Sequence, residues 1–231
     1  MARLTRRPLP LRLSGMSLVR NMDAMKLILA SSLTSGLLGK TLHHLPKPLA
    51  LNKIVCIPTA ANVYLPENRI WQTEEMEVFR NAGAVLDIFD IAGKTPQQVA
   101  QKLEQSDIVY VTGGNSFYLL EHMQRSGVAA PLKALFKRGG VYIGTSAGAV
   151  VVSEDIGYIT PMDEPYMAKL ASTKGLGLVP YLIVPHTHHP KFGPLARQIF
   201  AKPPIGQNLI GLTDNQALLV SGTVTELVQA S

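Results

Sequence analysis

From Met25 onward, short apolar runs alternate with longer segments in which apolar and polar residues are mixed. A short apolar run bounded by turn-forming residues is typical of a buried strand, and an amphipathic segment after it is typical of a helix. Five runs predict strands, at 26–30, 53–58, 84–89, 107–112 and 141–145. Strands that alternate with helices form a parallel sheet, so the pattern predicts an α/β protein.

The segments between these strands carry helix signals. Thr95, Pro96 and Gln98 have the spacing of a capping box with proline at the first helical position. Helices are predicted from residue 96 onward and at 66–82, 116–125 and 128–138. Glycine follows three of them, as is common where a helix ends.

After Val152 the alternation loosens, and proline and glycine interrupt the chain more often. Apolar runs predict further strands at 181–184, 209–212, 217–220 and 224–228. The connections look too short for helices, so some of these strands are expected to be antiparallel. With no internal repeat and no linker, residues 25–231 are predicted to form a single domain, a three-layer α/β/α sandwich with a mostly parallel sheet.

Composition narrows the class of protein. The chain has 231 residues, of which 46% are hydrophobic, enough to bury a sizeable core. No apolar run approaches the roughly 20 residues that cross a bilayer, so a soluble protein without a membrane partner is expected. The single cysteine, Cys56, lies within an apolar run and is interpreted as a buried thiol in a reducing compartment, which favours a cytoplasmic location.

The net charge of +6 is concentrated at the start of the chain. Five arginines against one aspartate give residues 1–24 a charge of +4 and leave +2 for the rest, so no nucleic-acid partner is predicted. We interpret residues 1–24 as a basic extension, either a disordered tail or translated sequence ahead of a start at Met16, Met22 or Met25. A targeting segment is the alternative.

The strongest chemical signal is the sequence Gly-Thr-Ser-Ala-Gly over residues 144–148, directly after an apolar run. This combination is typical of a strand-to-helix turn that presents a nucleophilic serine, here Ser146. Gly144 and Gly148 permit a sharp turn and close packing, while the Ala147 N–H is free to face an oxyanion. A glycine-rich turn with a helix-capping serine is the alternative interpretation.

A second pair of glycines follows the predicted strand 107–112. Ligands collect at the carboxyl ends of strands in α/β sheets, so residues just after each strand are candidates for a site. The Gly114 N–H could join that of Ala147 in an oxyanion hole. A tight turn in which Asn115 or Ser116 caps the next helix is equally compatible with this segment.

Three histidines follow the predicted strand 181–184. His186 is nearest to the strand end and is the candidate general base, whereas His188 and His189 are interpreted as solvated loop residues. A metal site is not predicted, because this spacing lacks a nearby Asp, Glu or Cys ligand. Asp214 follows another strand and could orient the imidazole, although a turn-forming Asp-Asn pair is the alternative.

We expect the serine, histidine and aspartate to lie at strand ends of one sheet. Their order in the chain, Ser, His, Asp, differs from the Ser, acid, His order of α/β-hydrolases. Four segments, 111–120, 142–149, 177–186 and 210–214, together resemble the S51 serine peptidases, a family that includes aspartyl dipeptidase (peptidase E) and is similar to cyanophycinase. The resemblance runs from about Met25 to the C-terminus. It implies a class I glutamine-amidotransferase-like fold in which serine replaces the cysteine nucleophile.

Carried onto this sequence, the resemblance makes Ser146 the nucleophile and His186 the base, with the amides of Gly114 and Ala147 forming the oxyanion hole. Asp214 is the preferred third member of the triad.

Two further residues complete the predicted site. Asp163 is the alternative acid, because the family has an acid near the active site at this place. Asn115 is assigned to substrate binding.

The resemblance implies a serine-type peptidase that hydrolyses short peptides without a cofactor. A preference for an N-terminal aspartate is not predicted, because segment 189–194 is shorter than the basic loop of the dipeptidase members. The alternatives are a hydrolase of isopeptide or ester substrates and a catalytically inactive homologue that binds a small molecule. A homodimer is a possible assembly.

Overall fold

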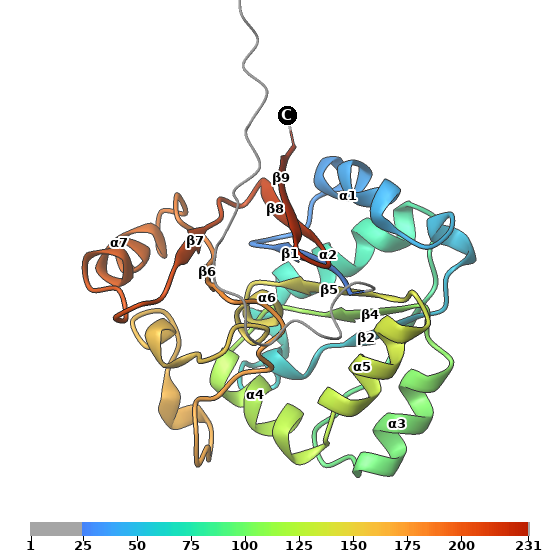
Figure 1. The fold of residues 1–231 in the computed structure, drawn as a ribbon, viewed down its shortest axis with the longest axis horizontal. Coiled ribbons are helices and arrows are strands. Elements are labelled where there is room, and N and C mark those ends of the chain that lie inside the picture. Colours follow the sequence, from blue (N-terminus) through green and yellow to red (C-terminus); the bar gives the residue numbers. More distant parts are fainter. Residues whose placement is uncertain (1–24, 231) are drawn as a thin grey trace, which may run out of the picture.

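The computed structural model describes residues 25–230, and the predicted basic extension over residues 1–24 lies outside the described residues. A central seven-stranded sheet has the order β3-β2-β4-β5-β1-β8-β9 (Figure 1). The first five strands pair in parallel and lie where the sequence predicts them: β1 (Lys26–Ala30), β2 (Ile54–Ile57), β3 (Leu86–Ile88), β4 (Ile108–Val111) and β5 (Val141–Thr145). The hairpin of β8 (Gln216–Ser221) and β9 (Val224–Gln229) extends the sheet antiparallel to β1.

Helices cover both faces of this sheet. Strand residues Ile28 and Ala30 point to the face packed by α1 (Ser35–Thr41) and α2 (Ile70–Asn81). Their neighbours Leu27 and Leu29 point to the other face, which is packed by four helices: α3 (Pro96–Glu104), α4 (Ser116–Arg125), α5 (Ala129–Lys137) and α6 (Ala147–Val150). The three layers confirm the predicted α/β/α sandwich (Figure 1).

The local helix signals act as predicted. The Thr95 side chain accepts a hydrogen bond from the Gln98 N–H (3.3 Å), and the Gln98 side chain accepts one from the Thr95 N–H (2.9 Å). This is the reciprocal capping box at the start of α3. The helix predicted at 66–82 is shorter, because a 3-10 turn at Pro66–Asn68 precedes α2.

The segment after Val152 differs from the prediction. β6 (Leu182–Val184) and β7 (Leu209–Gly211) form a separate parallel two-stranded sheet, and α7 (Gly193–Ala201) connects them. These elements lie to the left of the main sheet in Figure 1. The expectation that these connections are too short for helices is therefore wrong, because residues 185–208 leave room for α7, and proline is compatible with its first turn, where Pro194 lies. The expectation of one shared sheet is also wrong, because β6 and β7 pair only with each other.

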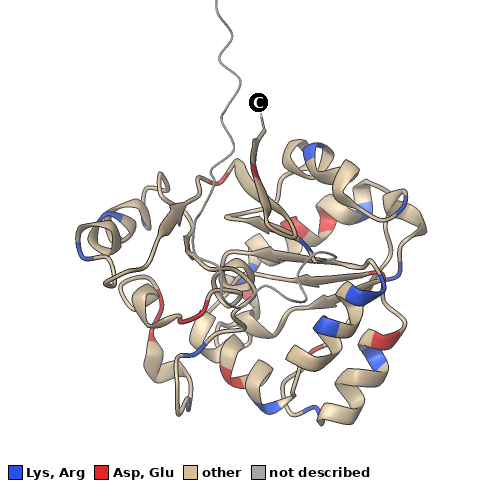
Figure 2. Cartoon of the chain, viewed as in Figure 1, with Lys and Arg blue, Asp and Glu red and all other residues tan. Residues whose placement is uncertain are grey.

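Within residues 25–230, no helix is both long enough and apolar enough to cross a membrane. Lys and Arg positions are interspersed with Asp and Glu positions along the described fold (Figure 2).

A buried carboxylate lies under the carboxyl ends of the central strands. Glu75, on α2, is 5% exposed and accepts hydrogen bonds from four groups. The Ser32 hydroxyl (3.2 Å) and the Leu33 N–H (3.0 Å) donate to one oxygen. The Tyr110 hydroxyl (2.7 Å) and the Thr145 hydroxyl (2.8 Å) donate to the other. Burial raises the pKa of Glu75 while these hydrogen bonds act against that shift. The carboxyl group thus joins the end of β1 to the ends of β4 and β5.

Replacing Glu75 with leucine should destabilise the fold, because four donors would lose their acceptor together. We expect Glu75→Leu to lower the free energy of unfolding by about 3 kcal/mol, measured by urea denaturation. The exposed Glu77 on the same helix is the control, and Glu77→Leu should change stability by less than about 0.5 kcal/mol. Equal effects of the two substitutions would contradict the structural importance of the network.

Candidate active site

Ser146 occupies a strained turn between β5 and α6. Its φ and ψ angles are 48° and −111°, a backbone conformation that non-glycine residues rarely adopt. The chain packs tightly on both sides of it. A Cβ on Gly144 would lie 2.4 Å from the Gly148 carbonyl oxygen, and one on Gly148 would lie 2.3 Å from the Val111 carbonyl oxygen. Both glycines are therefore required by close packing.

The imidazole of His186 lies between a hydroxyl and a carboxylate. Its Nε2 is 3.0 Å from Ser146 Oγ, and its Nδ1 is 2.6 Å from Asp214 Oδ1. His186 follows β6 and Asp214 follows β7, and the parallel pairing of these two strands brings the two residues to the same end. The small sheet thus supplies histidine and aspartate, while the main sheet supplies serine.

The environment of Asp214 favours its charged form. Burial alone would raise the pKa of its carboxyl group, but hydrogen bonds with His186 and Ser31 and the nearby histidine charges outweigh it, so the pKa is lowered. With a proton on Nδ1 facing this carboxylate, Nε2 of His186 can accept the Ser146 hydroxyl proton. The arrangement is chemically competent for nucleophilic catalysis by a serine.

Ser31 also belongs to this cluster, and the sequence analysis missed it. It is fully buried at the end of β1. Its hydroxyl donates to Asp214 Oδ1 (2.7 Å) and accepts from the His186 backbone N–H (2.7 Å). The sequence signal that points to Ser31 is its position directly after the apolar run of β1, because ligands collect at the carboxyl ends of strands. Ser31 fixes the histidine backbone and the aspartate side chain together.

Asp163 lies in a different part of the site. Its Oδ2 accepts a hydrogen bond from the Ser116 N–H (2.8 Å) at the start of α4. Burial raises its pKa to about 6. Of the two candidate acids, Asp214 is the one that is hydrogen-bonded to the His186 imidazole.

The Asn115 side chain is used within the protein. It accepts from the Tyr118 N–H (2.9 Å) as the N-cap of α4 and donates to the Glu164 carbonyl oxygen (3.1 Å). The residue is fully buried. Its amide therefore fixes the loop that contains Glu164, and Asn115 rather than Ser116 is the residue that caps α4.

The glycine turn before α4 lies against Ser146. A Cβ on Gly113 would be 3.1 Å from Ser146 Cβ, and one on Gly114, whose φ is +143°, would be 2.2 Å from the Ala60 backbone. The N–H groups of Gly114 and Ala147 donate to no acceptor among residues 25–230. Both amides therefore remain available to an external acceptor.

The other two histidines have different surroundings. His188 is exposed, as predicted. His189 is a loop residue that is partly exposed and packs on Phe192, with ring centroids 5.2 Å apart. Among residues 25–230, no three His, Cys, Asp or Glu side chains are grouped to hold a metal ion.

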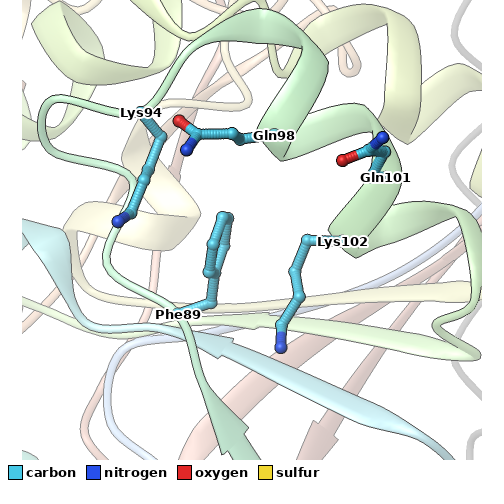
Figure 3. Close-up of a pocket in the computed structure, with 5 residues that line it drawn as sticks. All are labelled: Phe89, Lys94, Gln98, Gln101 and Lys102. Carbon is cyan, nitrogen blue, oxygen red and sulfur yellow. The ribbon is translucent and has the colours of Figure 1, made fainter.

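A hollow of about 330 Å³ lies elsewhere on the surface. It is lined by Phe89, Lys94 and three residues of α3, namely Gln98, Gln101 and Lys102 (Figure 3). Lys102 lies over the Phe89 ring at 5.5 Å and pairs with Asp87 at 2.5 Å, so its charge already has a partner. No residue of the serine, histidine and aspartate cluster lines this hollow.

Comparison with known proteins identifies the family. The sequence profile of peptidase family S51 matches residues 27–228. The chain belongs to peptidase family S51. It is therefore a peptidase.

Sequence relatives of this S51 peptidase include named and uncharacterised members. It is 31% identical to an uncharacterised peptidase of Pasteurella multocida over 73% of this chain and 81% of that protein. An uncharacterised peptidase of Listeria monocytogenes is 29% identical over 73% of this chain and 82% of its own length. Peptidase E of Salmonella arizonae is 33% identical over 70% of this chain and 69% of its own length.

A solved structure shares the fold of this S51 peptidase. The 1.5 Å crystal structure of a candidate peptidase E from Listeria monocytogenes superposes with a TM-score of 0.81 and 27% identity. The match covers 90% of this chain and 99% of that one. The family resemblance and the α/β fold predicted from the sequence are both confirmed.

The lowered pKa of Asp214 predicts a specific pH dependence of stability. A carboxyl group whose folded pKa lies below its unfolded value, about 3.9, contributes stability above that value and loses it as the pH falls through the folded pKa. Wild type should therefore lose its stability advantage over Asp214→Asn as the pH falls from about 5 to about 3. Urea denaturation at several pH values measures the difference in the free energy of unfolding between the two proteins. A wild-type advantage that grows toward low pH would contradict a lowered pKa of Asp214.

Proposed function

We propose that this S51 peptidase is a serine peptidase that hydrolyses short peptides through an acyl-enzyme on Ser146. One observation carries the proposal: the His186 imidazole lies 3.0 Å from the Ser146 hydroxyl and 2.6 Å from the Asp214 carboxylate. Ser146 is the nucleophile, His186 the general base and Asp214 the group that orients and stabilises the imidazolium.

The reaction has two halves. As Ser146 Oγ bonds to the substrate carbonyl carbon, its proton moves to His186 Nε2, and the amides of Gly114 and Ala147 bind the oxyanion. His186 then gives this proton to the leaving amine, and the C–N bond breaks. In the second half a water molecule attacks the ester and gives a proton to His186. The C–O bond to Ser146 then breaks, this proton returns to Ser146 Oγ, and the acid is released.

The comparisons support the substrate class. A relative covering most of this chain is named peptidase E. The intact hydrogen-bonded triad argues against an inactive binding homologue. Hydrolysis of isopeptide or ester bonds would use the same groups, so substrate tests must include those bonds.

The cellular setting is part of the proposal. Cys56 is fully buried, and burial raises its pKa to about 12, so the thiol is unreactive. A free, protected thiol supports a reducing compartment such as the cytoplasm. Homodimerisation stays a prediction.

Substitution of the nucleophile tests the activity. Ser146→Ala should lower kcat by about five to six orders of magnitude, because the acyl-enzyme can no longer form. The measurement is mass spectrometry of products from a library of dipeptides, short peptides, isopeptides and esters. A small serine-directed phosphonylating reagent should also label Ser146 of the wild type covalently. Retained hydrolysis in Ser146→Ala would contradict the proposal. If wild type cleaves only esters or isopeptides, the proposed substrate class of short peptides is wrong.

Ser31→Ala tests the residue that the sequence analysis missed. Loss of its hydrogen bond to a charged group should lower kcat about 10- to 100-fold and change KM little. Ser106→Ala is the control, because Ser106 is also buried and donates a hydrogen bond, to the Leu103 carbonyl oxygen (2.8 Å), but precedes β4. Kinetics of Ser31→Ala that match this control would exclude a positioning role.

A further inference from the structure

The only tryptophan of the chain lies beside the nucleophile, at the second position of α2. Trp71 Nε1 and Ser146 Oγ each lie 3.7 Å from the point that a Cβ on Gly113 would occupy. The polar edge of the indole therefore faces the same small space as the hydroxyl. This space is open only because Gly113 has no side chain.

The indole N–H of Trp71 donates to no acceptor among the described residues 25–230, and the ring is partly exposed. Tryptophan N–H groups usually find a hydrogen-bond partner when the ring is enclosed. A free donor that faces the space beside Ser146 is placed to meet a substrate oxygen there.

Trp71 is held by a second aromatic ring. Tyr64 packs against it edge to face, with ring centroids 5.6 Å apart and an interplanar angle of 86°. The guanidinium of Arg69 donates to the Tyr64 carbonyl oxygen at 2.8 and 2.5 Å and so fixes the Tyr64 segment. Trp71 and Tyr64 thus form an aromatic wall whose position is fixed before a substrate binds.

Charges of both signs lie beside this aromatic wall. Burial raises the pKa of Tyr64 to about 12, and the nearby carboxylates of Asp163 and Glu164 contribute to the shift. Arg69, the cation in this segment, is engaged by backbone carbonyl oxygens. An apolar substrate side chain would gain contact with the two rings.

We propose that Trp71 binds the substrate, its ring packing on an aromatic or large aliphatic side chain next to the scissile bond and its N–H donating to a substrate backbone oxygen. The proposal rests on the proposed peptidase activity of Ser146 and adds a preference for apolar side chains. Trp71 is thereby a specificity-determining residue, supported by Tyr64.

Two substitutions separate the two roles of the indole. Trp71→Ala removes the ring and should lower kcat/KM for dipeptides containing Phe or Leu about 10- to 100-fold more than for those containing Gly. Trp71→Phe keeps a ring but removes the N–H, and should lower kcat/KM by a similar factor of about 3 to 10 for all dipeptides. Glu74, at an exposed position on the same helix, provides the control. Glu74→Ala should leave kcat/KM unchanged for the dipeptides containing Phe or Leu and for those containing Gly.

The assay uses the full chain and dipeptides in which Gly, Ala, Leu, Phe, Asp or Lys is placed at the first or the second position. The rate at which the small phosphonylating reagent labels Ser146 is measured in parallel. This rate reports the reactivity of Ser146 alone, because the reagent has no side chain to pack on the aromatic wall. Wild type should favour Phe or Leu at one position by at least about tenfold. Trp71→Ala should lose this preference while its labelling rate stays within about threefold of wild type.

The outcomes separate this inference from the proposed function. A wild type that is labelled and cleaves peptides but favours Asp, or whose selectivity survives Trp71→Ala, overturns the inference and leaves the peptidase proposal standing. A wild type that is neither labelled nor active overturns both. If Trp71→Ala fails to fold, as shown by lost labelling and a lost thermal transition, the test rests on Trp71→Phe. An unchanged kcat/KM in Trp71→Phe would then overturn the inference, and the expected loss of kcat/KM would support it.

Discussion

The site depends on one constraint, the close packing of the turn between β5 and α6. A φ of 48° at Ser146 costs about 1–3 kcal/mol, and this cost is met only where surrounding contacts leave the chain no alternative. Those contacts are the approach of the Gly148 and Val111 carbonyl groups to positions where only glycine fits, and the hydrogen bond from the Ser146 N–H to the Ala30 carbonyl oxygen (3.0 Å). In this conformation the Ser146 hydroxyl lies 3.0 Å from His186 Nε2, and the Ala147 N–H donates to no acceptor among residues 25–230.

Polar groups behind the sheet hold the same region from the other side. Glu75 binds Thr145, the residue before the nucleophile, and Leu33, two residues after Ser31. The two serines of the site, Ser31 and Ser146, therefore belong to segments that one buried carboxyl group connects. A preorganised site needs such support, because a misplacement of about 1 Å can cost two orders of magnitude in rate.

The triad is assembled from two sheets, which gives the small sheet a clear role. β6 and β7 pair in parallel, with α7 as the connection between them, so His186 and Asp214 reach the same end and approach Ser146 together. Ser31 then links this small sheet to the main one through Asp214 and the His186 backbone. The Trp71 indole and the glycine turn at Gly113 also lie close to Ser146.

The sequence by itself determined the parallel strands, the capping box at Thr95 and the nucleophile turn at 144–148, because each is encoded within a few neighbouring residues as apolar runs, caps and obligatory small residues. It also indicated His186 and Asp214 through their places after strands. The tertiary structure alone decided that Asp214 is hydrogen-bonded to His186 and that a second sheet carries both residues. It also decided that Ser31 joins this cluster and that the Trp71 indole lies near Ser146. These choices depend on contacts between distant parts of the chain, such as that of Ser31 with Asp214, 183 residues away. No local pattern of apolar and polar residues encodes a contact of that kind, since it arises only when separate layers pack together.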